Sequence, residues 1–194
     1  AWSSDRPRRN AGPPRPADIS TRCRVLRPGD RMRYSPGSLL VIVSPSAEES
    51  ERFALRVLEE QGAFFSEEKI RKLLRGRVAD ADLEAQTTAL LDATVAKRLQ
   101  SGETVVVATG SLDPAERERW IRPAAAVRRP RHVILLDLPR DAVSEDDRPV
   151  LNELRRALDA GELGDEGVQT AMRLGGTTIT ELKRIVFRPP PKDD

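Results

Sequence analysis

The sequence predicts an α/β domain with a doubly wound parallel sheet and helices on both faces, arranged as a three-layer sandwich. Three apolar runs, at 39–43, 104–108 and 132–137, are typical of strands that are covered on both faces. Segments with helical periodicity separate these runs, and this alternation favours a parallel sheet. A chain of 194 residues, of which 38% are hydrophobic, is long enough for one such domain.

The ends of several elements can be predicted from capping residues. Gly62 is expected to end the first helix as its C-cap. Ser66 is the N-cap of the next helix, and Asp113 with Pro114 begins a later one. In chain order we expect strand 39–43, helix 48–61, strand 63–65, a helix from 67 with Ile70, Leu73 and Leu74 inside, helix 80–100, strand 104–108, helix 114–122 and strand 132–137. The segments 150–160, 165–173 and 180–186 have helical or mixed character.

Charge and proline content divide the chain into parts. Residues 1–37 hold nine arginines and three acidic residues, a net charge of +6, whereas the whole chain carries +2. We predict a disordered, basic, proline-rich arm at 1–18, an edge strand and linker at 19–37, the main domain at 38–188 and a disordered tail at 189–194. In the edge strand, Cys23 and Val25 should face the sheet while Arg22 and Arg24 face water.

Composition excludes several classes of site. The chain has one cysteine and one histidine, so neither an intrachain disulfide nor a Cys/His metal site can form, and we expect no metal. His132 enters a buried strand at the end away from the ligand-binding rim and is interpreted as structural. No apolar run approaches the roughly 20 residues that span a bilayer. With no signal peptide recognised, we expect no membrane association and a cytoplasmic location.

Residues 38–58 form the strand, turn and helix that frame a phosphate-binding loop. Such a loop follows Gly-x-x-x-x-Gly-Lys-Ser/Thr, in which glycine amides and lysine hold phosphate and the hydroxyl holds Mg²⁺. The corresponding positions are Ser44, Glu49, Ser50 and Glu51. Three carboxylates, including Glu48, outweigh the roughly half charge of the helix N-terminus. We therefore expect no cofactor, with ATP and Mg²⁺ as the alternative.

Four segments carry a family resemblance. They are the first strand–loop–helix, Gly-Glu-Thr-Val-Val-Val at 102–107, Leu-Asp-Pro-Ala-Glu-Arg at 112–117 and Val-Ile-Leu-Leu-Asp-Leu-Pro at 133–139. In this order and spacing, the chain from about 38 to 175 resembles the P-loop kinases of the polynucleotide 5′-kinase and zeta-toxin-like group, with a degenerate loop.

The resemblance implies a catalytic acid and an arginine on the helix after the second strand, and Glu68 and Arg71 fall at these positions. Glu68 can also be explained as an acid in the first turn of a helix. The segment that usually reads Asp-Ala-Thr-Asn is Ala-Thr-Gly-Ser at 108–111, so its carboxylate is missing. The stretch that supplies lid arginines in these kinases contains Arg155, Arg156 and Arg173 here.

Three functions compete on this evidence. We favour a non-catalytic, pseudokinase-like domain that acts as an interaction or scaffold module, with a protein partner or a homo-oligomer. The first alternative is an ATP-dependent nucleotide or polynucleotide 5′-kinase that uses Glu68 and Arg71. The second is a nucleic-acid-binding protein, because a basic arm neutralises phosphates. The arginines proposed to contact nucleic acid or another anionic partner are Arg6, Arg8, Arg9, Arg15, Arg22 and Arg24.

Overall fold

A computed structural model describes residues 22–192 of the chain. Its centre is a six-stranded sheet in the order β1-β7-β6-β3-β5-β4, in which every neighbouring pair is parallel. These strands are β1 (Arg24–Leu26), β3 (Leu39–Val43), β4 (Phe64–Phe65), β5 (Val105–Thr109), β6 (Arg131–Asp137) and β7 (Thr170–Gly175). A second, two-stranded parallel sheet pairs β2 (Arg31–Tyr34) with β8 (Arg184–Phe187). The predicted parallel α/β fold is confirmed.

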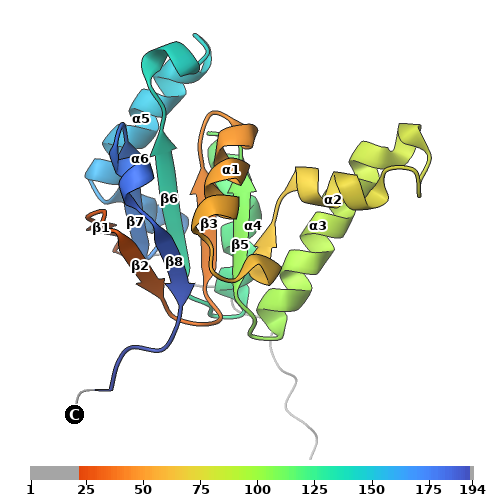
Figure 1. Ribbon diagram of the computed structural model, residues 1–194, viewed down its shortest axis with the longest axis horizontal. Coiled ribbons are helices and arrows are strands. Elements are labelled where there is room, and N and C mark those ends of the chain that lie inside the picture. The colour runs from red at the N-terminus through yellow and green to blue at the C-terminus, as the bar shows by residue number, and fades with distance from the viewer. Residues whose placement is uncertain (1–21, 193–194) are drawn as a thin grey trace, which may run out of the picture.

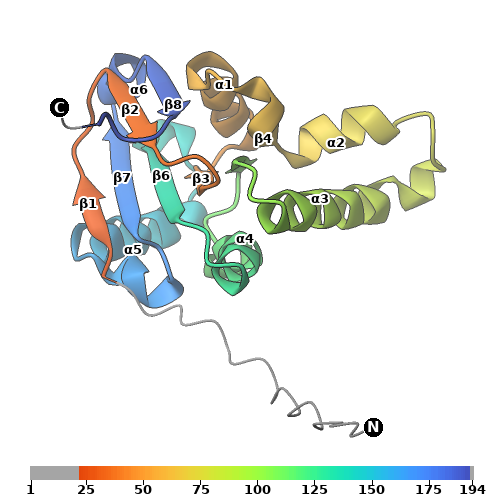
Figure 2. The ribbon, with the colours of Figure 1, turned by 90° about the horizontal axis from the view of Figure 1, so that it is seen from below.

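Helices cover both faces of the main sheet, as Figure 1 shows. They are α1 (Ala47–Val57), α2 (Glu67–Leu74), α3 (Leu83–Gln100), α4 (Pro114–Ala126), α5 (Asp147–Asp159) and α6 (Thr178–Glu181). Short 3₁₀ turns are η1 (Gln61–Ala63), η2 (Asp80–Asp82), η3 (Arg140–Ala142) and η4 (Glu162–Glu166). In Figure 2, α3, α4 and α5 lie on one side of the sheet, whereas α1, α6 and the β2-β8 sheet lie on the other. No helix in the part of the chain that the structure describes is both long and apolar enough to cross a bilayer.

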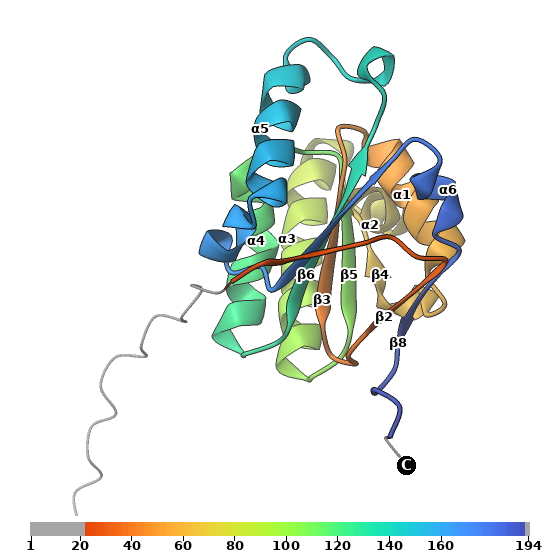
Figure 3. The ribbon, with the colours of Figure 1, turned by 90° about the vertical axis from the view of Figure 1, so that its left-hand side faces the viewer.

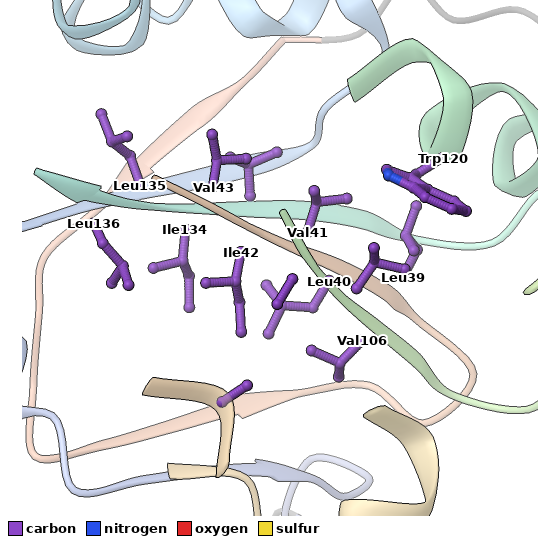
Figure 4. Packing of buried hydrophobic residues seen from close by; sticks show 14 of the residues in the cluster. Leu39, Leu40, Val41, Ile42, Val43, Val106, Trp120, Ile134, Leu135 and Leu136 are labelled. Atoms are coloured by element: carbon purple, nitrogen blue, oxygen red, sulfur yellow. The ribbon is translucent and has the colours of Figure 1, made fainter. Parts of the chain in front are cut away.

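The core is centred on β3 and β6, whose residues are all buried. Alternate side chains of these strands enter opposite layers, as expected for a strand with a period of two. Figure 4 shows Val43 and Leu135 on the side of Trp120, and Ile42 and Leu136 on the opposite side. A strand covered on both faces can therefore be apolar throughout, which is why these runs were predictable.

Two strands near the C-terminus contradict the prediction. Residues 165–173 contain the first four residues of β7, which pairs with both β6 and β1, and residues 180–186 contain most of β8. Arg173 interrupts the apolar pattern of β7, so no strand periodicity is visible in the sequence. Pairing with distant strands, rather than local propensity, decides these segments.

The predicted helix ends were wrong in two places. The first helix ends at Val57, and its last carbonyls accept from the Gln61 side chain, whose Nε2 lies 2.9 Å from the Leu58 oxygen, so Gly62 is not its cap. The helix predicted to end at residue 122 continues through Pro123 to Ala126, because Ala124 and Ala125 are buried against the sheet.

Two smaller predictions were wrong in part. Leu73 was expected inside but is 53% exposed, whereas Ile70 is buried. In the edge strand, Cys23 contacts the core and Arg22 and Arg24 are exposed, as predicted, but Val25 is 47% exposed and Leu26 contacts the core instead. Residues 189–192 form neither helix nor strand. The arm predicted at 1–18 lies outside the described residues.

Candidate functional site

The turn between β3 and α1 contains the four positions of the predicted phosphate loop. Only residues 44–46 separate the two elements, so Glu49, Ser50 and Glu51 lie inside α1. The Ser46 Oγ caps the helix by accepting a hydrogen bond from the Glu49 backbone N–H at 3.3 Å. The Glu49 N–H is therefore already hydrogen-bonded within the protein, although the free N–H groups of a helix N-terminus are the usual place where an anion binds.

Ser44 and Ser50 are brought together beneath this turn. Their Oγ atoms lie 2.7 Å apart, and Ser50 donates to the Thr109 carbonyl oxygen at 2.8 Å. Ser44 Oγ also accepts from the backbone N–H of Ser46 at 3.1 Å. Both serines are fully buried. Ser44 stands at the first glycine position of the phosphate-loop motif, and Ser50 at its lysine position. Their hydroxyl groups therefore connect the start of α1 to the end of β5.

The backbone after β5 packs directly on this turn. A Cβ placed on Gly110 would lie only 2.3 Å from the Ala47 nitrogen, a distance that real side chains do not tolerate. Glu48 and Glu49 turn outward and form ion pairs with Arg52. The backbone of Gly110 therefore packs on the first residue of α1, and exposed carboxylates lie beside this contact.

A larger cavity of about 850 Å³ opens beside this turn, between α1, α2, β5 and α4. Acidic side chains predominate in its lining: Glu48, Glu51, Glu67, Glu68 and Glu116 face three basic ones, Arg52, Arg71 and Lys72. Trp120 forms part of the wall, and its indole Nε1 donates to Glu116 at 3.3 Å. Because acids outnumber bases, the cavity disfavours a strongly anionic ligand.

The predicted catalytic pair lies in this cavity, on α2. Arg71 Nη1 donates to Glu68 at 2.8 Å, and the same guanidinium forms two hydrogen bonds with Glu84, at 2.7 and 3.0 Å. The hydrogen bonds that Arg71 donates to Glu84, and then to Glu68, raise the pKa of Arg71. Glu68 and Arg71 are therefore close, as the resemblance implied, but they neutralise each other and the arginine is held by a second acid.

Asp137, at the carboxyl end of β6, organises the opposite side of the rim. Its carboxylate accepts from Arg155 Nε at 2.8 Å and from Arg173 Nε at 2.7 Å, and its side chain is 7% exposed. Arg156 points away and pairs with Glu153 and Glu162. Asp137 was not predicted as a partner for two arginines, although it is the acid that ends a long apolar strand.

A small cavity of about 260 Å³ lies beside Asp137 and differs in charge from the larger one. Its lining includes Arg140, Arg148 and Arg155 but no acidic side chain. Neither Arg140 nor Arg148 forms an ion pair within residues 22–192. This cavity is therefore cationic.

The remaining predicted site residues are on the surface or in the core. Arg22 and Arg24 are exposed at the β1 edge, whereas Arg6, Arg8, Arg9 and Arg15 lie outside the described residues. His132 is buried between β7 and the second sheet, with Nδ1 2.6 Å from Thr170 Oγ1 and its ring 4.6 Å from that of Tyr34. Residues 22–192 contain no group of three or more His, Cys, Asp or Glu residues placed to hold a metal ion.

Comparison with known proteins identifies the family. A family model described as an AAA domain matches residues 45–148, from the turn after β3 to the start of α5. A candidate kinase from Chloroflexus aurantiacus is similar at 18% identity, with a TM-score of 0.44, over 75% of this chain and 88% of that one. The tunicamycin resistance protein of Deinococcus radiodurans is similar at 17% identity, with a TM-score of 0.39, over 74% and 91%. No curated protein matches the sequence. Because the family model covers more than half of the residues and the sheet is parallel throughout, the chain belongs to the AAA domain family and has a P-loop kinase-like α/β fold.

Proposed function

We propose that this domain is a non-catalytic member of the P-loop kinase-like group and acts as a protein-interaction or scaffold module. The observation that carries the proposal is the closure of the turn after β3 by the protein's own groups. Ser50 joins Ser44 and Thr109 in a buried hydrogen-bond network, and Gly110 packs against Ala47. These contacts stabilise the fold at the place where a kinase would hold phosphate.

The residues of this turn do not fit the triphosphate of ATP. A phosphate loop needs free backbone amides, a lysine and a Mg²⁺-binding hydroxyl. Here Ser46 caps an amide, Ser50 stands at the lysine position and Glu51 at the hydroxyl position. Glu51 also lines the cavity beside the turn, where its carboxylate would repel a triphosphate tail.

Nucleotide binding provides the test. The full chain should show a change in melting temperature below about 1 °C when ATP and Mg²⁺ are added at millimolar concentration, because a ligand that does not bind the native state cannot stabilise it. Differential scanning fluorimetry at matched ionic strength measures this shift. Sodium triphosphate with Mg²⁺ serves as the ionic control.

The kinase alternative has one supporting observation, the cationic cavity lined by Arg140, Arg148 and Arg155.

Two matched variants test whether the domain is a kinase that uses Arg71. Arg71 and Arg122 are both helical arginines paired with glutamate, but only Arg71 lines the larger cavity. A rise of several degrees with ATP that disappears in Arg71→Ala and persists in Arg122→Ala would refute the proposal and favour a kinase. Phosphate transfer to a 5′-hydroxyl oligonucleotide would do the same.

A further inference from the structure

A groove of about 560 Å³ lies on the opposite side of the sheet from α1, between the start of α4, α5 and η4. Its floor and walls are largely apolar and are formed by Leu112, Pro114, Pro149, Val150, Leu154, Ala157 and Leu163. Val150 is 40% exposed, whereas the three leucines of the groove are buried. An open apolar groove of this kind suits a peptide segment better than a compact polar ligand.

The rim of the groove is acidic. Glu153, Glu162, Asp165 and Glu166 line it, and the only basic side chain in the lining is Arg117. Arg117 is buried and bonds Glu166 at 2.8 Å through both Nε and Nη2, while Arg156 neutralises part of Glu153 and Glu162. Asp165 is exposed and forms no ion pair within residues 22–192. The rim therefore keeps a negative charge that a basic segment can complement.

The N-terminal end of the described chain lies beside this rim. A Cβ on Gly161 would be 3.2 Å from the Cys23 carbonyl oxygen, so Cys23 packs against the residue that immediately precedes η4. Burial, and then the charge of Glu166, raise the pKa of the Cys23 thiol to about 11, which agrees with this proximity. In Figure 3 the orange start of β1 lies next to the blue segment that follows α5.

The sequence that precedes Arg22 has the matching chemistry. Residues 6–16 read Arg-Pro-Arg-Arg-Asn-Ala-Gly-Pro-Pro-Arg-Pro, with four arginines, four prolines and no acid. Proline rings pack on apolar surfaces in an extended conformation that needs no internal hydrogen bonds. An extended chain spans about 3.3 Å per residue, so 21 residues reach roughly 70 Å, more than enough to cross the groove from Cys23.

We propose that residues 6–16 of the same chain bind in the groove between α4, α5 and η4, with proline rings on the apolar floor and arginines at the acidic rim. The arm is then an intramolecular ligand of the domain, and another basic, proline-rich peptide would have to displace it. This binding surface lies apart from the turn after β3, so the inference does not depend on whether ATP binds. It also competes with the hypothesis that the arm contacts nucleic acid.

Tryptic cleavage of the full chain tests the proposal. Cleavage after Arg8 and Arg9, the two arginines of the arm that no proline follows, is monitored by mass spectrometry at low ionic strength. The double variant Val150→Ser with Asp165→Lys removes apolar surface and reverses a rim charge. We expect its arm to be cleaved about tenfold faster than that of the wild type, because proteolysis follows the population of the undocked arm. Added salt should accelerate cleavage of the wild type toward the rate of the variant.

The matched control changes the same chemistry elsewhere. Leu90→Ser with Asp80→Lys alters a 39% exposed leucine and an exposed aspartate near α3, away from the groove, and should leave the cleavage rate unchanged. Equal rates in the wild type and in the groove variant would overturn the proposal. Protection that weakens on dilution, together with a dimer in light scattering, would assign the groove to the arm of a second copy and would also overturn it.

Discussion

His132 contacts both the main sheet and the second sheet. It lies in β6, its Nδ1 is 2.6 Å from Thr170 Oγ1 on β7, and its ring packs on Tyr34 of β2. Burial, and then the nearby charge of Arg131, lower the pKa of His132 to about 4. The imidazole is therefore neutral in the folded protein at pH 7 and serves packing rather than proton transfer.

Acid should destabilise the protein through this residue. An unfolded histidine has a pKa near 6.5, so between pH 6.5 and about 4 the unfolded state binds a proton that the folded state does not, and stability falls as pH falls. Between pH 7 and pH 5 the wild type should lose about 2 kcal/mol more than His132→Gln, measured by urea unfolding. Because this is the single histidine, its Hε1 resonance can be titrated by NMR. A midpoint above pH 6 would disprove the expectation.

At the scale of elements, the turn between β3 and α1 depends on the end of β5. The first residue of α1 packs on the backbone of Gly110, and Ser50 bonds the carbonyl of Thr109. A strand, a turn and a helix that are predictable from local sequence are thus held in place by residues almost sixty positions later. The glycine is required here by close approach of two backbones rather than by an unusual dihedral angle.

Replacing Gly110 with alanine should test this contact. The added Cβ would lie 2.3 Å from the Ala47 nitrogen, so α1 must shift, at a cost of about 2 kcal/mol or more in the free energy of unfolding. Gly62→Ala is the matched control, because nothing lies within 4 Å of its Cβ position. Chemical denaturation of both variants gives the comparison. Equal stability would mean that the turn is not closed by β5.

At the scale of the whole molecule, Asp137 connects three elements at the rim. Its buried carboxylate bonds Arg155 on α5 and Arg173 on β7, and thereby joins β6 to the C-terminal part of the domain. Neutralising a buried carboxylate leaves cationic partners without their counter-charge. The two arginines are partly exposed, and water compensates for some of this loss.

Asp137→Asn should therefore destabilise the fold on the order of 2 kcal/mol. Asp159→Asn removes the exposed second partner of Arg173 and should change stability by less than about 0.5 kcal/mol. Thermal unfolding followed by circular dichroism distinguishes them. If the two variants melt together, Asp137 does not connect α5 and β7 in the way described here.

The sequence by itself determined the fold class and the central strands. Runs such as Leu39–Val43 are apolar because both faces are covered, and this property is local and visible. Capping residues also acted locally, so the starts of α2 and α4 at Ser66 and Asp113 were predictable. The helix predicted after Ser66 also contained Glu68 and Arg71, the positions that the resemblance implied.

Only the tertiary structure decided the rest. β7 is a strand because it pairs with β6 and β1, and its own residues do not encode that choice. The closure of the turn by Gly110, the pairing of Arg71 with Glu84 and the position of Cys23 beside η4 all join residues far apart in the chain. Such contacts form because they contribute to the packing free energy of the whole domain. A short window of sequence does not contain both partners of such a contact.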